Sequence, residues 1–352
     1  MSTDGPLVSI VVGNYNYARF LPRSIGSALG QTYDRVEVVV VDDASTDDSA
    51  DVIRGFGSRV VPVFKAGNAG HGATFNSGFA ASRGDIVMFL DADDYLYPDA
   101  ARKVVEAWTR TTAQAQFRLD LVDVSGQVVD SYPAAEVAFD SGDVVPLLLT
   151  RGRYQATVTS GNAFSRAALQ AILPMPEDAF RQGGDGYLVT VAPFHGEIVS
   201  IEERLGAYVQ HGGNHSGFQS RLVNRLHWQM EHEAARHSAL EAKAQAMGLR
   251  MSPNPGLRDP SHLENRIALR CLDPADTTRP ALPRPSLAAH GVVAVLRTRL
   301  PLGRRVVLAA WFVAVGLLPR AAARHLVNWR LAKYSRPPAV DRLLGKLRRA
   351  TS

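Results

Sequence analysis

Short apolar runs alternate with amphipathic segments along the first 110 residues. Four of these runs are rich in Val, Ile and Phe and have the length of buried strands, at residues 8–12, 36–41, 60–64 and 86–90. Segments with helical periodicity or helix-start signals follow them, at residues 20–29, 46–56, 67–82 and 98–110. Strands that alternate with helices of this length predict βαβ units, in which helices cover both faces of a mostly parallel sheet.

Polar and acidic side chains follow three of the predicted strands directly. They are Tyr15 after the first, Asp42 and Asp43 after the second, and Asp91, Asp93 and Asp94 after the fourth. Ligands of parallel α/β sheets bind outside the carboxyl ends of the strands. Carboxylates this close raise one another's pKa unless a positive charge lies between them. A Mg²⁺ or Mn²⁺ ion that carries phosphates is the natural partner, since it often takes only one or two protein carboxylates.

The pattern changes after residue 110. A hairpin is predicted at 117–129, a strand with a polar loop at 157–164, and two closing strands at 198–201 and 205–209. Asp185 follows Gly183 and Gly184, which allow a close approach of the backbone to a ligand, and precedes the apolar run 187–191. Residues 219–247 have a helical and highly charged composition, and the proline-bearing stretches that follow predict linkers.

The composition is that of a folded soluble protein with one large or two modest domains, since 46% of the 352 residues are hydrophobic and 21% are charged. Cys271 is the single cysteine, which excludes an intrachain disulfide and fits a reducing compartment. The first residues contain no basic segment followed by an apolar one, so we expect no signal peptide.

The charge is divided unevenly along the chain. From Gly291 onward there are thirteen Lys and Arg but one acidic residue, Asp341, whereas the preceding residues carry a net charge of about −7. Residues 306–319 contain no charge but are too few to span a bilayer. They predict a helix at a membrane interface, where Trp311 and Trp329 are suitable anchors. A helical accessory domain with a basic outer face is the alternative, and no nucleic-acid-binding motif is present.

Three motifs together resemble family 2 glycosyltransferases of the GT-A fold. They are VSIVVGNYN at 8–16, VVVVDDASTD at 38–47 and FLDADD at 89–94, with Asn68, Gly70 and Asn76 between them. The resemblance covers roughly residues 6 to 215 and implies an α/β, Rossmann-like fold of mostly parallel strands flanked by helices. We therefore expect a GT-A domain at 1–218, a helical segment with a Pro-rich linker at 219–290, and a basic, apolar helical tail at 291–352.

The resemblance also implies roles for individual residues in an inverting transfer from a nucleotide-diphosphate sugar. Donor binding is expected of Tyr15 and Asp43 at the base, Asp42 at the strand end, Asn68, and Asp91 at the ribose. Asp93 would hold Mn²⁺ or Mg²⁺ at the diphosphate, and Asp185 matches the catalytic base. One departure from the family pattern is Ala44, where many members have Gly. The loop around Asp185 also lacks the Glu-Asp pair that some branches of the family have.

Other readings of these residues stay open. Asp94 is either a substrate contact or a supporting residue, and Asn68 and Asn76 either bind the donor or shape a turn. Glu177 and Asp178 are alternative bases, and Lys65 and Arg83 are candidate phosphate partners. His211 is a candidate neighbour of the metal. Its spacing from His215 resembles a zinc helix, but Gly212 and Gly213 break helical structure, and no Glu follows His211 as that motif requires.

The leading hypothesis is a metal-dependent glycosyltransferase that adds single sugars in cell-surface polysaccharide or glycolipid synthesis. Its partners would be a nucleotide-diphosphate sugar, with UDP-sugars favoured, a saccharide or lipid-linked acceptor, and an anionic membrane surface, but no nucleic acid. We expect it in the cytoplasm, peripheral on the inner face of the cell membrane. A processive synthase lacks support because the chain has no Gln-x-x-Arg-Trp motif. A nucleotidyltransferase and a catalytically silent sugar-nucleotide-binding protein are the remaining alternatives.

Overall fold

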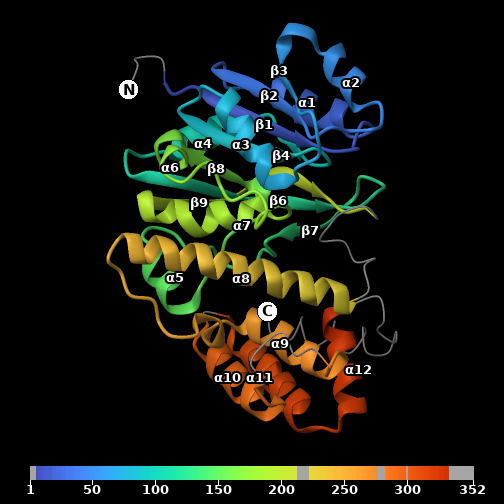
Figure 1. Ribbon diagram of the computed structural model, residues 1–352, viewed down its shortest axis with the longest axis vertical. Helices are drawn as coiled ribbons and strands as arrows, with labels where there is room; N and C mark the ends of the chain where they lie inside the picture. The colour runs from blue at the N-terminus through green and yellow to red at the C-terminus, as the bar shows by residue number, and fades with distance from the viewer. Residues whose placement is uncertain (1–4, 212–221, 276–281, 299, 333–352) are drawn as a thin grey trace. The chain divides into compact units, whose positions relative to one another are not determined.

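The computed structural model describes residues 5–211, 222–275, 282–298 and 300–332. The chain divides into two compact units. The first consists of residues 1–146 and 154–211, and the second of residues 147–153 and 212–352. Both contain a hydrophobic core of their own. The helices and most of the strands are labelled in Figure 1.

The first unit is built on one mixed sheet of nine strands (Figure 1). Its strands are β1 (Val8–Asn14), β2 (Val36–Asp42), β3 (Val61–Phe64), β4 (Ile86–Asp91), β5 (Tyr95–Leu96), β6 (Thr112–Val122), β7 (Val128–Tyr132), β8 (Asn162–Ser165) and β9 (Glu197–Val209). The order is β3-β2-β1-β4-β8-β6-β9-β5, and β7 pairs with β6. The predicted βαβ part is confirmed, because β1 lies between β2 and β4 and is parallel to both.

Two details of the predicted strands are wrong. The two closing strands are a single strand, β9, which pairs with β6 over most of its length through irregular register shifts. Register shifts lie beside Arg204, where charged residues interrupt the apolar pattern of the sequence. The apolar run 187–191 belongs to a helix, α7 (Gly184–Val191), that begins at the glycines beside Asp185.

Helices cover both faces of the parallel part of the sheet. Alternate residues of β1, β2 and β4, among them Ile10, Val40 and Met88, share a core with α1 (Leu21–Leu29) and α4 (Ala100–Ala107). The residues between them face α3 (His71–Ala81), where a Cβ on Gly78 would lie 2.2 Å from Val11. This alternation follows from the two-residue period of a strand, and it explains why these strands are apolar throughout.

The remaining helices of the sheet region are short. They are α2 (Ser49–Gly55), α5 (Val145–Arg151), α6 (Arg166–Gln170) and the 3-10 turn η2 (Thr159–Gly161), besides α7. Residues 147–151 of α5 belong to the second unit. The expected polar loop and strand at 157–164 correspond to η2 followed by β8.

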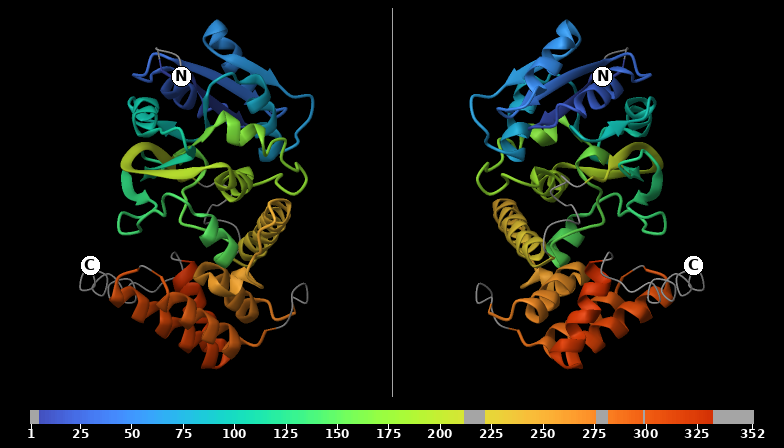
Figure 2. Two further views of the ribbon diagram at one scale, coloured as in Figure 1. Left: turned by 90° about the vertical axis from the view of Figure 1, so that its left-hand side faces the viewer. Right: turned by 90° about the vertical axis from the view of Figure 1, so that its right-hand side faces the viewer.

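The second unit is helical. It contains α8 (Leu222–Ala246), the 3-10 turn η4 (Pro255–Arg258), α9 (Pro260–Leu272), α10 (Arg284–Leu296), α11 (Leu302–Leu317) and α12 (Arg320–Leu331). Figure 2 shows α10 and α11 packed side by side in orange and red. Leu226, Leu263 and Phe312 belong to one core, so residues on both sides of position 290 pack together. The three-part division of the chain at 218 and 290 stays a prediction.

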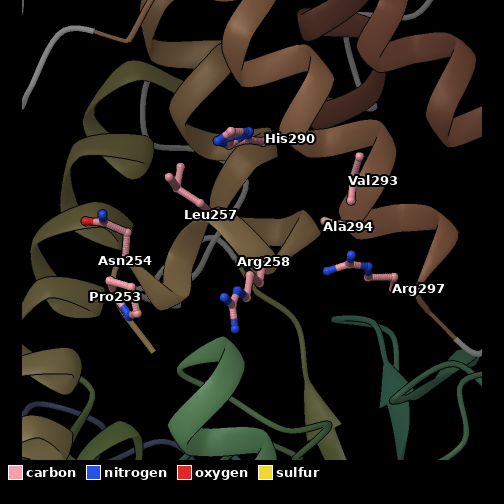
Figure 3. A pocket seen from close by; sticks show the side chains of 8 residues that line it. All are labelled: Pro253, Asn254, Leu257, Arg258, His290, Val293, Ala294 and Arg297. Atoms are coloured by element: carbon pink, nitrogen blue, oxygen red, sulfur yellow. The ribbon is translucent and has the colours of Figure 1, made fainter. Parts of the chain in front are cut away.

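Trp311 is half-buried and packs against this core. Its indole N–H donates a hydrogen bond to the carbonyl oxygen of Leu326, and the ring packs against Phe312. Beside α10 and η4 lies a cavity of about 420 Å³, whose lining residues are labelled in Figure 3. Among the described residues, no helix combines the length and the apolar character that a membrane span requires.

Candidate active site

The carboxyl ends of β1, β2 and β4 bring the expected residues to one edge of the sheet. The register places Asn14 beside Asp42, and Gly13 beside Asp91. Asn14 donates a hydrogen bond from Nδ2 to Asp42 Oδ1 at 2.7 Å, and the Ser45 hydroxyl donates to the same oxygen at 2.6 Å. Asp42 is buried and connects the loops after β1 and β2, so its carboxylate supports the strand end from inside the protein.

The two loops are joined further by Asn16. Its backbone N–H donates to Ser45 Oγ, and its side-chain oxygen accepts from the backbone N–H of Thr46. Asn16 and Ala44 both have positive φ values, of 58° and 59°. The position of Ala44 therefore requires a left-handed backbone, which is the physical reason that glycine suits it. Tyr15, between these loops, is 43% exposed and presents its ring at the surface.

Asp43 is engaged by the segment that precedes α3. Its carboxylate lies 2.7 Å from Lys65 Nζ and accepts hydrogen bonds from the backbone N–H groups of Ala69 and Gly70. Its side chain is only 2% exposed. Asn68, in the same segment, accepts a hydrogen bond from Arg181 through Oδ1 at 2.6 Å. Lys65 thus neutralises Asp43 in this structure, and both residues shape the loop that borders the sheet edge.

The carboxylate of Asp91 faces His71, the first residue of α3. His71 Nε2 lies 3.1 Å from Asp91 Oδ1, and His71 Nδ1 accepts a hydrogen bond from the backbone N–H of Gly184 at 3.2 Å. Acceptance at Nδ1 places the ring proton on Nε2, which donates to Asp91. Burial lowers the pKa of His71, but the hydrogen bond and charge of Asp91 and the charge of Asp185 outweigh it, so that the pKa is raised.

Asp185 lies one residue beyond this contact, in the first turn of α7. Gly183, the residue before the helix, has a φ of 71°, which a glycine adopts without strain. The helix N-terminus favours a negative charge at this position. His71 therefore connects the end of β4 with the helix that carries Asp185.

Asp93 pairs with His211, which follows β9. His211 Nε2 lies 2.9 Å from Asp93 Oδ2, and the side chains are 4% and 13% exposed. The imidazole stacks on Phe20 with ring centroids 4.7 Å apart. Tyr17 lies beside both rings, and burial together with the charges of Asp93 and Asp91 raises its pKa to about 12.

Asp94 is a supporting residue in this structure. It is fully buried, accepts a hydrogen bond from the Ser160 hydroxyl, and accepts another from the backbone N–H of Val209 at 2.9 Å. Burial, followed by the charges of Asp93 and Asp91, raises its pKa well above that of an ordinary carboxyl group. The contacts join the residues after β4 to η2 and to the end of β9.

The electrostatics and the donor atoms at Asp93 fit a divalent cation. Burial raises the pKa of Asp93, and the charge of Asp91 adds to this, even though the His211 hydrogen bond acts in the opposite direction. A carboxylate and an imidazole are suitable ligands for Mn²⁺, and a carboxylate for Mg²⁺. No group of three or more His, Cys, Asp or Glu side chains in the described part of the chain has the arrangement of a metal site.

A cavity of about 260 Å³ opens beside this pair. Its walls include Asp93, His211, Arg19, Arg23 and the hairpin turn between β6 and β7. The Arg23 guanidinium lies 3.5 Å from the centre of the Tyr95 ring. The sequence analysis missed both arginines and His71. The arginines have helical spacing after β1, but only the folded cavity shows that they face the acidic edge.

Other candidate residues lie farther from this chemistry. The prediction that Arg83 contacts phosphate is wrong. Arg83 pairs with Glu37 near the amino end of β2, whereas the acidic residues lie at the carboxyl ends of the strands, on the opposite edge of the sheet. Asn76 exchanges hydrogen bonds with the backbone of Met175 and donates to Glu177, so it holds a loop. Asp178 is exposed in a turn that precedes α7, and His215 lies outside the described residues.

Comparisons with known proteins show similarity to glycosyltransferases. Residues 9–129 match the model of the family described as glycosyl transferase family 2. An uncharacterized glycosyltransferase of Nostoc sp. is 36% identical over 214 residues, which are 59% of this chain and 66% of the relative. The succinoglycan biosynthesis protein ExoO of Rhizobium meliloti is 38% identical over 135 residues, which are 38% of this chain and 39% of the relative. The chain thus spans less than two thirds of these relatives.

A solved structure supports the fold. The mannosyltransferase PcManGT from Pyrobaculum calidifontis, in complex with GDP-Man and Mn²⁺, superposes with a TM-score of 0.50 at 18% identity. The superposition covers 94% of this chain and 87% of the other. The expected α/β architecture, with helices flanking the sheet and a C-terminal helical region, is confirmed.

Proposed function

The chain belongs to glycosyl transferase family 2, and from this premise we propose that it is a metal-dependent, inverting glycosyltransferase. It would move a single sugar from a nucleotide-diphosphate sugar to an acceptor hydroxyl. The observation that carries the proposal is the hydrogen-bonded connection from Asp91 through His71 to Gly184, beside Asp185. It joins the strand end expected to bind the donor to the helix expected to carry the base.

Donor binding is assigned to the edge formed by β1, β2 and β4. The exposed ring of Tyr15 is available for stacking on a base, and Asp91 retains 31% exposure for a ribose hydroxyl. Asp43 is assigned to the base, and Asp42 and Asn68 would act on the donor through the loops that they hold. Uracil is favoured, and guanine and thymine are the alternatives.

Asp93 would hold the Mn²⁺ or Mg²⁺ ion, with His211 beside it as a second ligand or as the group that orients the carboxylate. When bound, the cation would neutralise the charge that develops on the leaving diphosphate. Phe20 and Tyr17 pack against the His211 ring and fix its position beside Asp93. Arg19 and Arg23 add positive charge to the cavity beside it.

Asp185 would act as the general base in one displacement at the sugar. Its carboxylate takes the proton of the acceptor hydroxyl while the acceptor oxygen forms a bond to the anomeric carbon. The bond from that carbon to the diphosphate breaks with its electron pair, which leaves on the nucleoside diphosphate. A single displacement inverts the anomeric configuration, and NMR of the product tests this directly.

The acceptor is placed in cell-surface polysaccharide or glycolipid synthesis, as a saccharide or a lipid-linked precursor. The similarity to a succinoglycan biosynthesis protein supports this assignment. We place the reaction on the inner face of the cell membrane, since the C-terminal helices combine arginine with exposed apolar residues and contain no carboxylate between Asp276 and Asp341.

Asp93→Asn tests the proposal. The change keeps the side-chain shape but removes the charge that would hold the cation, so transfer should fall by about 100-fold or more. Asp51→Asn, an exposed change on α2, is the matched control and should leave activity unchanged. Transfer assays with Mn²⁺ and a panel of nucleotide sugars provide the measurement, and circular dichroism checks the fold. Full activity in Asp93→Asn would refute the assignment.

The same assay separates an enzyme from a silent binding protein. A thermal-shift screen of nucleotide sugars with Mn²⁺ first identifies the donor, because a ligand that binds only the folded protein stabilises it. A protein that is stabilised by a donor but neither hydrolyses it nor transfers its sugar to any acceptor would fit the silent alternative.

A further inference from the structure

One face of α11 is apolar and exposed. Phe312 and Val315 on the opposite face are fully buried, and Gly316 and Gly291 let α11 and α10 approach closely. The exposed large apolar residues on this face are Leu302 at 67%, Val306 at 56%, Val313 at 45% and Leu317 at 69%. Their spacings of four, seven and four residues place them within about 60° around a helix of 3.6 residues per turn. We call these four residues the α11 stripe.

The α11 stripe is unlike the outer face of an ordinary surface helix. Such a helix buries one apolar face and presents charged or polar residues to water. Here Ala310, which lies in the same sector, is exposed as well, and no polar side chain interrupts the row. Some occupant of matching apolar character is therefore expected to cover it.

The charges around the stripe indicate what kind of molecule covers it. Arg305 is in the first turn of α11, and the exposed Arg320 and Arg324 are in the first two turns of α12. The sequence contains no acidic residue between Asp276 and Asp341. A second copy of the chain would bring the same acid-free, arginine-bearing face, and the like charges would oppose pairing. An anionic lipid surface supplies both an apolar layer and phosphates.

The neighbouring helix α10 has a surface of the same kind. Figure 3 shows His290 and Arg297 on α10 together with Arg258 of η4 around a cavity that Val293 also lines. Val293 is 48% exposed, and none of the residues that line the cavity is acidic. Cations beside an apolar wall match a phospholipid, whose head group is charged and whose chains are not.

We propose that the α11 stripe lies at the boundary between head groups and acyl chains of an anionic bilayer, with the flanking arginines on the lipid phosphates. Helix α11 then lies in the plane of the interface, since it is too short to cross the membrane. The proposal gives a defined surface to the membrane location proposed above, but it does not depend on sugar transfer.

The test is co-sedimentation of the full-length protein with vesicles of phosphatidylcholine alone or with about one third phosphatidylglycerol. The wild type should bind the anionic vesicles, bind the neutral ones far less, and lose binding in high salt. The variant Val306→Asp/Val313→Asp puts two carboxylates into the stripe and should bind at least about ten-fold more weakly. Both valines are exposed, so the fold should be retained.

The matched control is Val128→Asp/Val129→Asp, at two exposed valines of β7, and it should bind as the wild type does. Unchanged binding of the stripe variant would overturn the proposal, as would equal binding to both vesicles. A wild-type dimer in solution that the stripe variant cannot form would point to a second copy instead. Asp93→Asn should still bind vesicles, so failure of the catalytic assignment would be distinguishable from failure of this surface.

Discussion

Three carboxylates after β4 lie in three different environments. Asp91 is partly exposed and faces His71, Asp93 is paired with His211, and Asp94 is buried beneath the end of β9. Burial and mutual repulsion raise the pKa values of Asp93 and Asp94, which makes this edge a place where a cation is favoured. At the scale of single residues, the environment rather than the residue type separates their roles.

His71 is the residue whose replacement tests this arrangement most directly. His71→Ala removes the donor to Asp91 and the acceptor of the Gly184 N–H group, so both the strand end and the Asp185 helix lose a fixed position. Residues that orient a site in this way typically contribute about 10- to 100-fold. We expect a decrease of that size in kcat, with a changed pH profile, measured by initial rates of transfer.

The control for His71 is His227→Ala. His227 also pairs with a carboxylate, Asp273 at 2.9 Å, but in the helical unit. It should leave kcat unchanged. If His71→Ala retained the wild-type kcat and pH profile, the connection from Asp91 to Gly184 would have no part in catalysis.

Helix α3 is the element that makes this connection. His71 is its first residue, and Asn76 hydrogen-bonds to the loop at Met175. The position of the helix itself is set by packing on β1 and β2. Gly78 lies where a Cβ would come within 2.2 Å of Val11 and 3.2 Å of Val41. Close packing on the sheet therefore determines the position of an active-site histidine two turns away.

Gly78→Ala tests this dependence on packing. The added methyl group overpacks the contact, so the free energy of unfolding should fall by about 1–3 kcal/mol, and transfer activity should fall as α3 moves. Gly55→Ala on α2, where a Cβ meets nothing within 4 Å, is the control and should be neutral or slightly stabilising. Urea unfolding measures both variants, and equal stability of the two would contradict the packing argument.

At the scale of the whole molecule, the two units differ in the charge of the side chains that they gather. The sheet unit concentrates carboxylates at one edge, and the C-terminal helices combine arginine with exposed apolar surface. Within the sheet unit, any cation bound at Asp93 acts on the stability of the folded state, because the unfolded chain does not hold Asp93 and His211 together.

Mn²⁺ should therefore raise the Tm, and the rise should depend on pH. The pKa of Asp93 is raised in the folded protein, so a proton competes with the cation at a pH above the ordinary Asp value of about 3.9. Stabilisation by Mn²⁺ should be present at neutral pH and be lost as the pH falls through the raised pKa. Thermal unfolding with and without Mn²⁺ from pH 5 to 8 tests this. Asp93→Asn should show no such stabilisation, and an equal rise in Tm in that variant would place the cation elsewhere.

The sequence alone determined the parallel part of the sheet and its acidic edge. Apolar runs that end in Tyr15, Asp42 and Asp91 are local signals, and parallel strands carry their ends to one edge, so strand order was enough to gather them. It also indicated the charge of the C-terminal region. The uncharged run 306–319 predicted a helix, and α11 covers most of it.

Only the tertiary structure decided which side chains face one another. His71 lies 20 residues from Asp91 and 113 from Gly184, and His211 lies 118 residues from Asp93, distances along the chain over which no periodic pattern carries information. The folded structure also placed Arg83 at the opposite edge of the sheet from the acidic residues, joined the two closing strands into β9, and packed Trp311 against Phe312. Contacts of this kind depend on the packing of whole elements, and a linear pattern of apolar and polar residues does not specify it.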